Sequence, residues 1–263
     1  MKYALVTGAS SGIGAEYARL LAEDGHNVIV ASNRYGENRR VAESLRRDCG
    51  VNAEPLYTDL TEPDAAEKIY AWCREREIEV DILVSNAGIL HFGLLTHTDT
   101  AAVDRIVALH CTTPAKLCRL FAADMCRRRE GRILLMSSIT AWTPYPTMSL
   151  YGATKSFLRN FGTSLRLELR GSGVSVTTVF PGAVDTPLYN LPERHRRILR
   201  STGLMLSASD TARRGLHAMM RGRARSIPGW AAKAGVLLCR LLPTCAVIPV
   251  MRIPAVRRLL ERL

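Results

Sequence analysis

The sequence predicts an α/β fold built on a single doubly wound parallel sheet of about seven strands, with helices on both faces. Short runs rich in β-branched residues alternate with helix-length segments from the first residue onward. These runs are nearly continuously apolar, as in ILLMS and VSVTTVF, which is typical of strands buried on both faces. A glycine-rich turn follows the first run directly, and residues 229–263 add an apolar and basic tail.

The elements follow one another in a regular order. The expected strands are residues 3–7, 27–32, 52–57, 81–85, 132–137, 175–180 and, as a short seventh, 225–228. The expected helices are residues 12–24, 37–48, 62–76, 100–129, 149–170 and 207–221. Alternation at this spacing implies right-handed crossovers between parallel strands. No repeat or linker interrupts the chain before the tail, so we expect one domain over 1–228 and an extension over 229–263.

Composition excludes several classes of protein. The chain has 263 residues, of which 47% are hydrophobic and 23% charged, so it is not disordered, collagen-like or a coiled coil. Its seven cysteines are an odd number without a C-x-x-C pair, which argues against a disulfide framework and a zinc ribbon. Only four residues separate Lys2 from Thr7, too few for the apolar region of a signal peptide. We therefore expect a cytoplasmic protein.

The net charge of +12 lies entirely in the C-terminal part of the chain. Residues 1–189 hold 21 basic and 21 acidic residues, whereas residues 190–263 hold 15 basic and three acidic ones. A basic block of this kind favours phosphates, a nucleic acid or an anionic membrane surface as partners. The arginines are mixed with long apolar runs and few aromatic residues, so we do not expect a nucleic acid partner.

The glycine-rich turn reads Thr7-Gly8-Ala9-Ser10-Ser11-Gly12-Ile13-Gly14. Gly8 permits a tight turn, Gly12 lets the backbone approach a pyrophosphate, and Gly14 allows close packing of helix and strand. The N-terminus of the following helix offers unpaired N–H groups to the phosphates. Glycines are common in turns, but the strand before this turn and the helix after it favour a dinucleotide site.

Further motifs follow this turn in a fixed order. They are Asp59 after the third expected strand, Asn86-Ala87-Gly88 after the fourth, Ser138 after the fifth, Tyr151-x-x-x-Lys155, and Pro181-Gly182 followed by Thr186. With the G-x-x-x-G-x-G spacing, this set resembles the short-chain dehydrogenase/reductase family over residues 3–228. The resemblance implies a Rossmann-like fold that binds a nicotinamide cofactor. The cofactor-binding residues that it implies are Gly8, Ser10, Ser11, Gly12, Ile13, Gly14, Asp59, Leu60, Asn86, Ala87, Gly88, Tyr151, Lys155, Pro181, Gly182, Val184 and Thr186.

The end of the second expected strand bears on the choice between NAD and NADP. A carboxylate there would bind the ribose 2′-hydroxyl of NAD, but the chain reads Ala31-Ser32-Asn33-Arg34. Arg34 can pair with the 2′-phosphate of NADP, and Ser32 and Asn33 can donate hydrogen bonds to it. The alternative is that Arg34 is a solvated loop residue. We expect NADP(H) in preference to NAD(H).

Tyr151 and Lys155 lie one turn apart on the same face of an expected helix. An unperturbed tyrosine has a pKa of about 10, and a nearby ammonium lowers it by favouring the phenolate. The resemblance implies that Ser138 hydrogen-bonds the substrate carbonyl, that Tyr151 exchanges the proton and that Lys155 also holds the nicotinamide ribose, while the cofactor carries the hydride. Ser137 and Ser149 are nearby and are assigned structural roles.

At position 110 the chain differs from the family's pattern of catalytic residues, because it has a histidine there. The matching family residue is an Asn that helps to hold a water relaying protons toward the lysine. Pro114 lies four residues later and lacks an N–H, so we expect a free carbonyl at His110 and a kinked helix. That carbonyl can hold the relay water by itself. His110 is therefore a catalytic candidate, and the alternative is a helix residue with no catalytic part.

Two groups of residues lie where the resemblance puts the substrate pocket. They are Trp142, Pro144 and Tyr145 and, after Thr186, Leu188, Tyr189 and Leu191. Aromatic and aliphatic side chains dominate both groups, which favours an apolar substrate, although ordinary packing explains them equally well. The histidines show no metal-ligand spacing, so no metal is expected.

The tail over residues 229–263 is both apolar and basic. Residues 234–251 include one charge, Arg240, and two prolines, which falls short of the clean apolar run of about 20 residues that a membrane-spanning helix needs. A segment with Trp230 at its start and arginines interspersed can lie in the interface of an anionic membrane. The alternative is that it packs on the body or on a partner subunit.

These observations predict an NADP(H)-dependent oxidoreductase that interconverts a ketone or aldehyde and an alcohol. We expect it to reduce a lipophilic carbonyl, such as a long-chain 3-keto lipid. The alternative is a catalytically weak cofactor-binding or scaffold protein on the same fold, which the change at His110 suggests. The resemblance also implies a homodimer or homotetramer.

Overall fold

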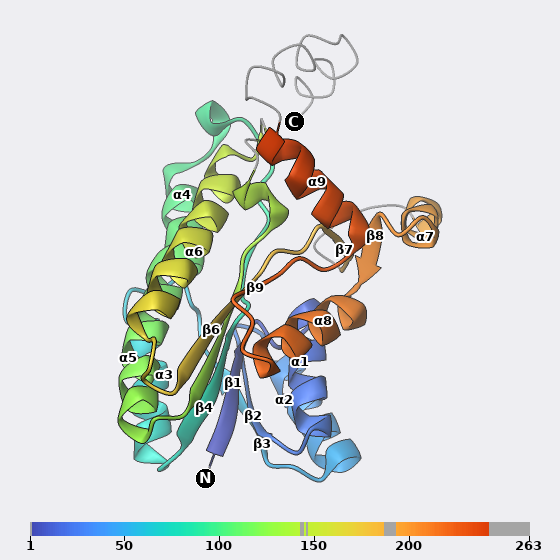
Figure 1. Cartoon of the computed structure of the whole chain (residues 1–263). Helices are drawn as coiled ribbons and strands as arrows, with labels where there is room; N and C mark the ends of the chain where they lie inside the picture. The colour runs from blue at the N-terminus through green and yellow to red at the C-terminus, as the bar shows by residue number, and fades with distance from the viewer. Residues whose placement is uncertain (1, 143–144, 146, 187–192, 242–263) are drawn as a thin grey trace, which may run out of the picture.

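A computed structural model describes residues 2–142, 145, 147–186 and 193–241 of the chain. Within these residues, seven parallel strands form one sheet in the order β3-β2-β1-β4-β5-β6-β9 (Figure 1). The strands are β1 (Lys2–Thr7), β2 (Asn27–Ser32), β3 (Ala53–Tyr57), β4 (Glu79–Ser85), β5 (Gly131–Met136), β6 (Val174–Val179) and β9 (Arg225–Ser226). The order reverses between β1 and β4, and this confirms the doubly wound parallel sheet that the sequence predicts.

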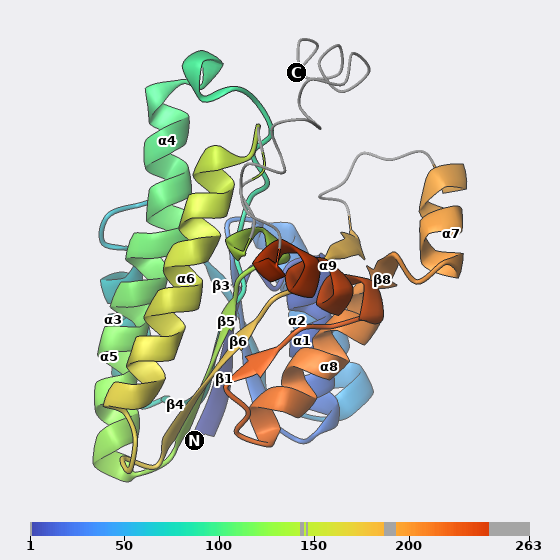
Figure 2. The same ribbon diagram turned by 45° about the horizontal axis from the view of Figure 1, so that its top comes forward.

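Helices cover both faces of the sheet (Figure 1, Figure 2). One face carries α1 (Gly12–Glu23), α2 (Tyr35–Cys49) and α8 (Ala208–Met220). The other face carries α3 (Ala65–Glu75), α4 (Thr100–Val107), α5 (Thr113–Arg128) and α6 (Ser149–Glu168). The strand–helix alternation of the sequence therefore gives three layers, as expected for a parallel sheet.

Alternate side chains of the strands enter two separate hydrophobic cores. In β1, Leu5 belongs to the core that includes Ile69 of α3 and Phe121 of α5, whereas Val6 belongs to the core that includes Tyr17 of α1. All five side chains are at most 2% exposed. Because both faces of the strand are covered, β1 has no polar face, and the four residues between Lys2 and Thr7 are all buried and hydrophobic.

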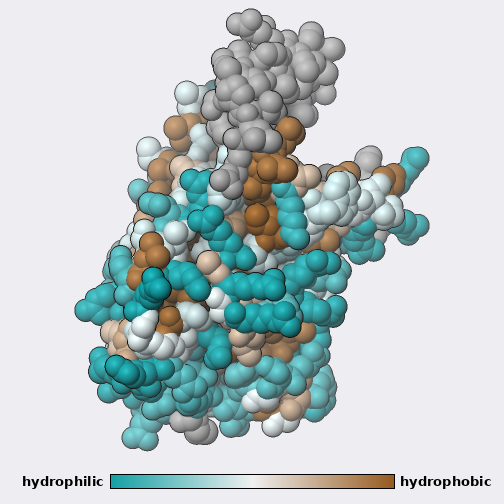
Figure 3. Space-filling view, viewed as in Figure 1, coloured by the Kyte–Doolittle hydropathy of each residue, from teal (hydrophilic) through white to brown (hydrophobic). Residues whose placement is uncertain are grey.

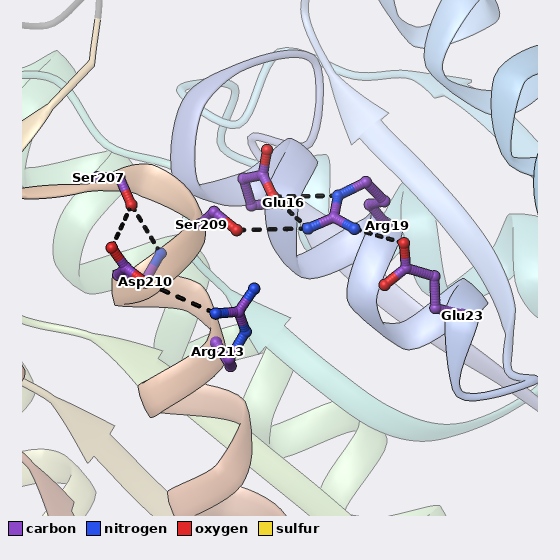
Figure 4. Close-up of polar contacts among 7 residues, drawn as sticks. All are labelled: Glu16, Arg19, Glu23, Ser207, Ser209, Asp210 and Arg213. Carbon is purple, nitrogen blue, oxygen red and sulfur yellow. Dashed lines mark hydrogen bonds and ion pairs between the residues drawn. The ribbon is translucent and has the colours of Figure 1, made fainter.

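Contacts between α1 and α8 fix one side of the fold. Arg19 of α1 donates to the Glu16 carboxylate at 2.8 Å and to Ser209 Oγ of α8 at 3.4 Å (Figure 4). Gly215 permits the close approach of the helices, because a Cβ there would lie 2.0 Å from the Tyr17 hydroxyl oxygen. These contacts hold α8 against α1, and the strand that follows α8, β9, forms one edge of the sheet.

The single helix expected over residues 100–129 is divided. α4 ends at Val107, a π-helical turn η2 (Ala108–Thr112) follows, and α5 begins at Thr113. Pro114 explains the division, because it has no N–H to donate to the carbonyl of His110 four residues earlier. The expected kink thus takes the form of a π turn that contains His110, and the single helix of the sequence prediction is wrong.

Several short elements are missing from the sequence prediction. They are the 3-10 turns η1 (Leu95–His97) and η3 (Ile139–Ala141), the two-stranded parallel sheet of β7 (Ala183–Asp185) and β8 (Met205–Ser207), and the helices α7 (Glu193–Ser201) and α9 (Trp230–Leu241). Most of these elements are too short to carry a recognisable hydrophobic period.

Across the described ranges, no helix combines the length and the apolar character needed to cross a membrane.

Candidate active site

The glycine-rich turn after β1 lies beside the segment that follows β4, where the strand order reverses. Thr7 joins the two segments, because its Oγ1 accepts from the backbone N–H of Asn86 at 3.0 Å and of Ala87 at 3.1 Å. Asn86 Nδ2 donates in turn to the Thr7 carbonyl at 3.1 Å. This positioning role of Thr7 is not predictable from the sequence, where its only local signal is a threonine directly before the first glycine.

Steric contacts explain the glycines of the turn. A Cβ on Gly8 would lie 2.8 Å from Ala87 Cα, and a Cβ on Gly14 would lie 2.1 Å from the Gly8 carbonyl oxygen. Gly8 and Gly12 also have positive φ angles of 67° and 57°, which other residues rarely adopt. Ser11, the N-cap of α1, makes no side-chain cap hydrogen bond. The first N–H groups of α1 therefore lack the usual side-chain acceptor, and this cradle fits the pyrophosphate of a dinucleotide.

The end of β2 has a polar network that the sequence analysis did not foresee. The Ser32 hydroxyl donates to Asn38 Oδ1 at 2.5 Å and accepts from the Arg34 N–H at 3.1 Å. The fully buried Asn38 donates to the carbonyls of Ser32 and Leu56, each at 2.9 Å. The expectation that Ser32 donates to a 2′-phosphate is therefore wrong, because its one hydrogen goes to Asn38.

Asn33 and Arg34 are exposed directly after β2, at the start of α2. Across the described ranges, no carboxylate lies within 4.0 Å of the Arg34 guanidinium. This end of β2 therefore carries a positive charge that is open to solvent and has no ion-pair partner among the described residues, while Glu37 in the first turn of α2 pairs with Arg40. Such a site fits a phosphate better than a neutral ribose hydroxyl.

Ser138 directly follows the end of β5 and caps the short turn η3. Its Oγ accepts from the Thr140 N–H at 3.2 Å, and its side chain is largely buried. Among the residues that the structure describes, no acceptor takes the Ser138 hydroxyl hydrogen, so the group can donate to a ligand. The neighbouring Ser137 instead donates to the Lys155 carbonyl at 2.7 Å, which ties β5 to α6 and is the structural role expected for it.

Tyr151 and Lys155 face each other within the first turns of α6. Lys155 Nζ lies 5.5 Å from the centroid of the Tyr151 ring and donates to the Met136 carbonyl at 3.0 Å. Burial of Lys155, which is 4% exposed, lowers its pKa from 10.5 to about 8. The ammonium thus remains charged at neutral pH, where a positive charge near Tyr151 favours its phenolate.

The lowered pKa of Lys155 predicts a pH-dependent stability. Between about pH 8 and pH 10.5 the unfolded chain keeps the Lys155 proton while the folded protein loses it, so the free energy of unfolding rises with pH. We expect Lys155→Met, which has no titrating group, to lose this rise of up to about 3 kcal/mol. Chemical denaturation of both proteins at neutral pH and at about pH 10 measures it. An identical pH dependence in the two proteins would show that Lys155 titrates normally.

His110 uses both ring nitrogens to connect the segment after β4 with α6. Its Nε2 accepts from the Ile89 N–H at 3.1 Å. Its Nδ1 donates to Thr154 Oγ1 at 2.9 Å, because that hydroxyl already donates to the Tyr151 carbonyl at 2.8 Å. Burial, together with the Lys155 charge, holds the pKa of His110 well below its usual 6.5, so the ring is neutral. Its ring also meets the Tyr151 ring edge-on, with 5.7 Å between centroids, and a part in proton relay stays a prediction.

Other predicted cofactor residues lie on the segments that follow β3 and β6. Asp59 Oδ1 closes a turn by accepting from the Thr61 N–H at 2.9 Å, and the Leu60 carbonyl accepts from a threonine of α5 at 2.8 Å. The Thr186 side chain faces Gly12, at 3.4 Å from the place of a Cβ there. The structure also brings Gly88 beside Lys155 and His110. Of the remaining candidates, Pro181 and Val184 are buried. Four others are partly or fully exposed to solvent, namely Ser10, Ser11, Ile13 and Gly182.

The residues expected to form the substrate pocket divide into two sets. Trp142 lies close to two guanidinium groups, with Arg159 Cζ at 4.4 Å and Arg225 Cζ at 5.6 Å from its ring centroid, and its ring centroid lies 5.6 Å from that of Phe180. These contacts support the packing alternative for Trp142. Tyr145 is exposed at the surface. The rest of the expected pocket lies outside the described residues, namely Pro144, Leu188, Tyr189 and Leu191.

Asp185, at the end of β7, is a further positioning residue that the sequence analysis missed. Its largely buried carboxylate lies 2.5 Å from an Arg196 nitrogen and 2.8 Å from an Arg200 nitrogen. Both arginines belong to α7, so this pair of contacts attaches α7 to the segment that carries Thr186. In the sequence, the only sign of this attachment is that Asp185 is an acidic residue close to several arginines.

The chain is similar in sequence to known oxidoreductases. The model of the short chain dehydrogenase family matches residues 2–196. YmfI of Bacillus subtilis, described as an uncharacterized oxidoreductase, is 38% identical over 190 residues, which cover 72% of this chain and 77% of that protein. The 17-beta-hydroxysteroid dehydrogenase type 3 of Mus musculus is 32% identical over 191 residues, which cover 71% of this chain and 61% of that protein.

Solved structures resemble the fold over nearly its whole length. A short-chain dehydrogenase from Sphingobium yanoikuyae in complex with NADPH has a TM-score of 0.79 at 28% identity, covering 97% of this chain and 98% of that chain. The bulky-bulky ketone specific alcohol dehydrogenase from Comamonas testosteroni has a TM-score of 0.78 at 28% identity, covering 97% and 96%. The protein therefore belongs to the short-chain dehydrogenase family and is an NAD(P)-dependent oxidoreductase that acts on CH–OH and C=O groups.

Proposed function

We propose that this protein uses NADPH to reduce a lipophilic ketone or aldehyde, such as a long-chain 3-keto lipid, to the alcohol. One observation carries the proposal. Ser138 at the end of β5 and the pair Tyr151 and Lys155 on α6 lie on elements that Ser137 ties together at 2.7 Å. They stand at the same edge of the sheet as the dinucleotide cradle after β1.

Each of the three side chains has a separate chemical task in this proposal. When bound, the cofactor supplies a hydride for the carbonyl carbon. The Tyr151 hydroxyl gives its proton to the carbonyl oxygen, and the Ser138 hydroxyl donates a hydrogen bond to the same oxygen. The Lys155 ammonium stabilises the phenolate left on Tyr151 until a proton from solvent restores the hydroxyl. Carbonyl, hydride and proton together give the alcohol.

The segment after β4 supports an apolar substrate. It exposes four large apolar side chains close together in the sequence, Ile89 at 39%, Phe92 at 50%, Leu94 at 38% and Leu95 at 56%. The Gly93 N–H donates to the Thr147 carbonyl at 2.9 Å, so this segment lies against the chain between Ser138 and α6. An exposed apolar strip at the edge of a candidate site is typical of a surface that receives a hydrophobic ligand. The ketone specificity named for the Comamonas testosteroni enzyme is consistent with this proposal.

Arg34 is the residue that we propose to select NADPH. We expect Arg34→Ala to weaken NADPH binding by about 1–3 kcal/mol, the range for a charge-assisted hydrogen bond, and to leave NADH binding nearly unchanged. Arg47→Ala, on the far end of α2, removes the same charge and should change neither affinity. Titration of the three proteins with each cofactor measures the effect. Equal losses for NADPH and NADH in Arg34→Ala would show that Arg34 does not contact the 2′-phosphate.

A further inference from the structure

A basic cleft lies outside the candidate active site, between α8, β9 and the start of α9. Its volume is about 430 Å³. Its cationic or titratable side chains are Arg213, Arg214, His217, Arg223, Arg225 and Lys233. No carboxylate is among the described residues that line it. The cleft therefore concentrates part of the C-terminal charge excess in one place.

Most of this charge has no ion-pair partner among the residues that the structure describes. Arg213 lies 3.6 Å from the Asp210 carboxylate one turn earlier in α8 (Figure 4). Within the described ranges, no carboxylate lies within 4.0 Å of Arg214, Arg223 or Lys233. Like charges at short range repel one another, so an anionic ligand would stabilise the cluster.

α9 exposes an apolar face next to the cleft. Trp230, Leu237 and Leu238 are 62%, 60% and 56% exposed, whereas Ala232 and Val236 are both 6% exposed. At 3.6 residues per turn, this spacing puts the three exposed side chains on one side of the helix and the two buried ones on the other. The helix thus packs on the body through small residues and presents its large apolar residues to solvent.

Lys233 joins the cleft to this helix face. It lines the cleft, and it lies on the exposed side of α9, about one turn from Trp230 and from Leu237. Figure 3 shows hydrophobic side chains around α9 with hydrophilic side chains beside them on the same face of the molecule. We call the cleft and the exposed face of α9 together the basic–apolar surface.

We propose that the basic–apolar surface docks on a bilayer that contains anionic phospholipids. Surface helices of this kind insert apolar side chains at the headgroup boundary, while basic side chains contact the anionic headgroups. Charge argues against two other occupants. A second copy would bring the same cations, and residues 242–263 would add four arginines and one glutamate. An anionic bilayer complements both the charge and the apolar face.

Docking here would place lipid close to the candidate active site. Ala232 of α9 packs near Gly182, whose Cβ, if present, would lie 3.3 Å from the Ala232 Cβ. Gly182 follows β6 at the edge of the sheet where Ser138 and Tyr151 stand. The arrangement suits a lipophilic substrate, but the docking itself does not depend on catalysis and is tested without it.

Cosedimentation of the full-length protein with vesicles tests the docking. Wild type should bind vesicles of phosphatidylcholine with phosphatidylglycerol, should not bind phosphatidylcholine alone, and should bind more weakly as salt rises. The triple variant Arg214→Gln/Arg223→Gln/Lys233→Gln should lose about a hundredfold in affinity, because each basic residue near an anionic surface contributes about fivefold. Leu237→Gln/Leu238→Gln should bind at least about tenfold more weakly, because it removes apolar burial.

A second triple variant, Arg39→Gln/Arg47→Gln/Lys68→Gln, is the matched control. It removes the same charge from exposed positions of α2 and α3 and should bind like wild type. Absence of wild-type binding to the anionic vesicles, equal losses in the two triple variants, or full binding by the double leucine variant would each overturn the proposal. So would calorimetric binding of inorganic phosphate without vesicle binding, which would assign the cleft to a soluble ligand. Thermal melts show whether each variant is folded. If the triple variant of the basic–apolar surface is not folded, Lys233→Gln alone replaces it, with an expected loss of about fivefold in vesicle affinity.

Discussion

Replacing Tyr151 by phenylalanine is expected to lower kcat for carbonyl reduction by about 10²–10⁴-fold and to leave NADPH affinity nearly unchanged. The change removes the hydroxyl that donates the proton. It keeps the ring, which meets His110 edge-on at 5.7 Å and lies 5.5 Å from Lys155 Nζ. Steady-state kinetics with a hydrophobic ketone and a titration with NADPH measure the two effects separately.

Tyr70→Phe provides a matched control. It also removes one phenolic hydroxyl, which donates to Asp124 Oδ2 at 2.9 Å between α3 and α5, away from the candidate site. We expect it to change stability slightly and to leave kcat unchanged. If Tyr151→Phe kept more than about a tenth of the wild-type rate, Tyr151 would not be the proton donor.

Ser138→Ala is expected to lower kcat by about 10²–10³-fold, the usual effect of removing one hydrogen-bond donor from a reacting oxygen. Because Ser138 Oγ also accepts from the Thr140 N–H at 3.2 Å, the variant should lose about 1 kcal/mol of stability as well. Kinetics and chemical denaturation measure the two losses.

Ser138→Thr separates the two roles of this hydroxyl. It keeps an oxygen in the same place and should recover part of both the activity and the stability. A Ser138→Ala protein that is less stable but fully active would show that the hydroxyl only caps η3.

The sheet and the first part of the site are predictable because their causes are local in the sequence. β5 and β6 consist mostly of apolar and β-branched residues because both of their faces are covered, so they stand out without knowledge of the fold. The need for glycine at Gly14 arises from the Gly8 carbonyl within the same turn, and Gly8 has a positive φ of 67°, which a tight turn favours. Pro114 likewise predicts a break in the helix, although the form of that break, a π turn, depends on packing.

The remaining features depend on residues that are far apart in the sequence. Thr7 and Asn86 are 79 positions apart, and their hydrogen bonds follow only from the pairing of β1 with β4. Ser32 resembles a phosphate ligand in sequence, and only the burial of Asn38 behind it shows where its hydrogen goes. Nor does the order of residues around His110 disclose its two hydrogen bonds. Local sequence patterns predict secondary-structure elements and motifs. The hydrogen-bond networks between distant residues become visible only when the helices and the sheet are packed together.

Transfer of deuterium from NADPH labelled at the nicotinamide C4 to a lipophilic ketone is the decisive measurement for the proposed reaction. The protein is incubated with the labelled cofactor and a panel of hydrophobic ketones, aldehydes and 3-ketoacyl compounds, and the alcohols are analysed by mass spectrometry. We predict an alcohol that carries one deuterium at the former carbonyl carbon, formed at least about a hundredfold more slowly by Tyr151→Phe. Tight NADPH binding without labelled alcohol from any lipophilic carbonyl would contradict the proposed function.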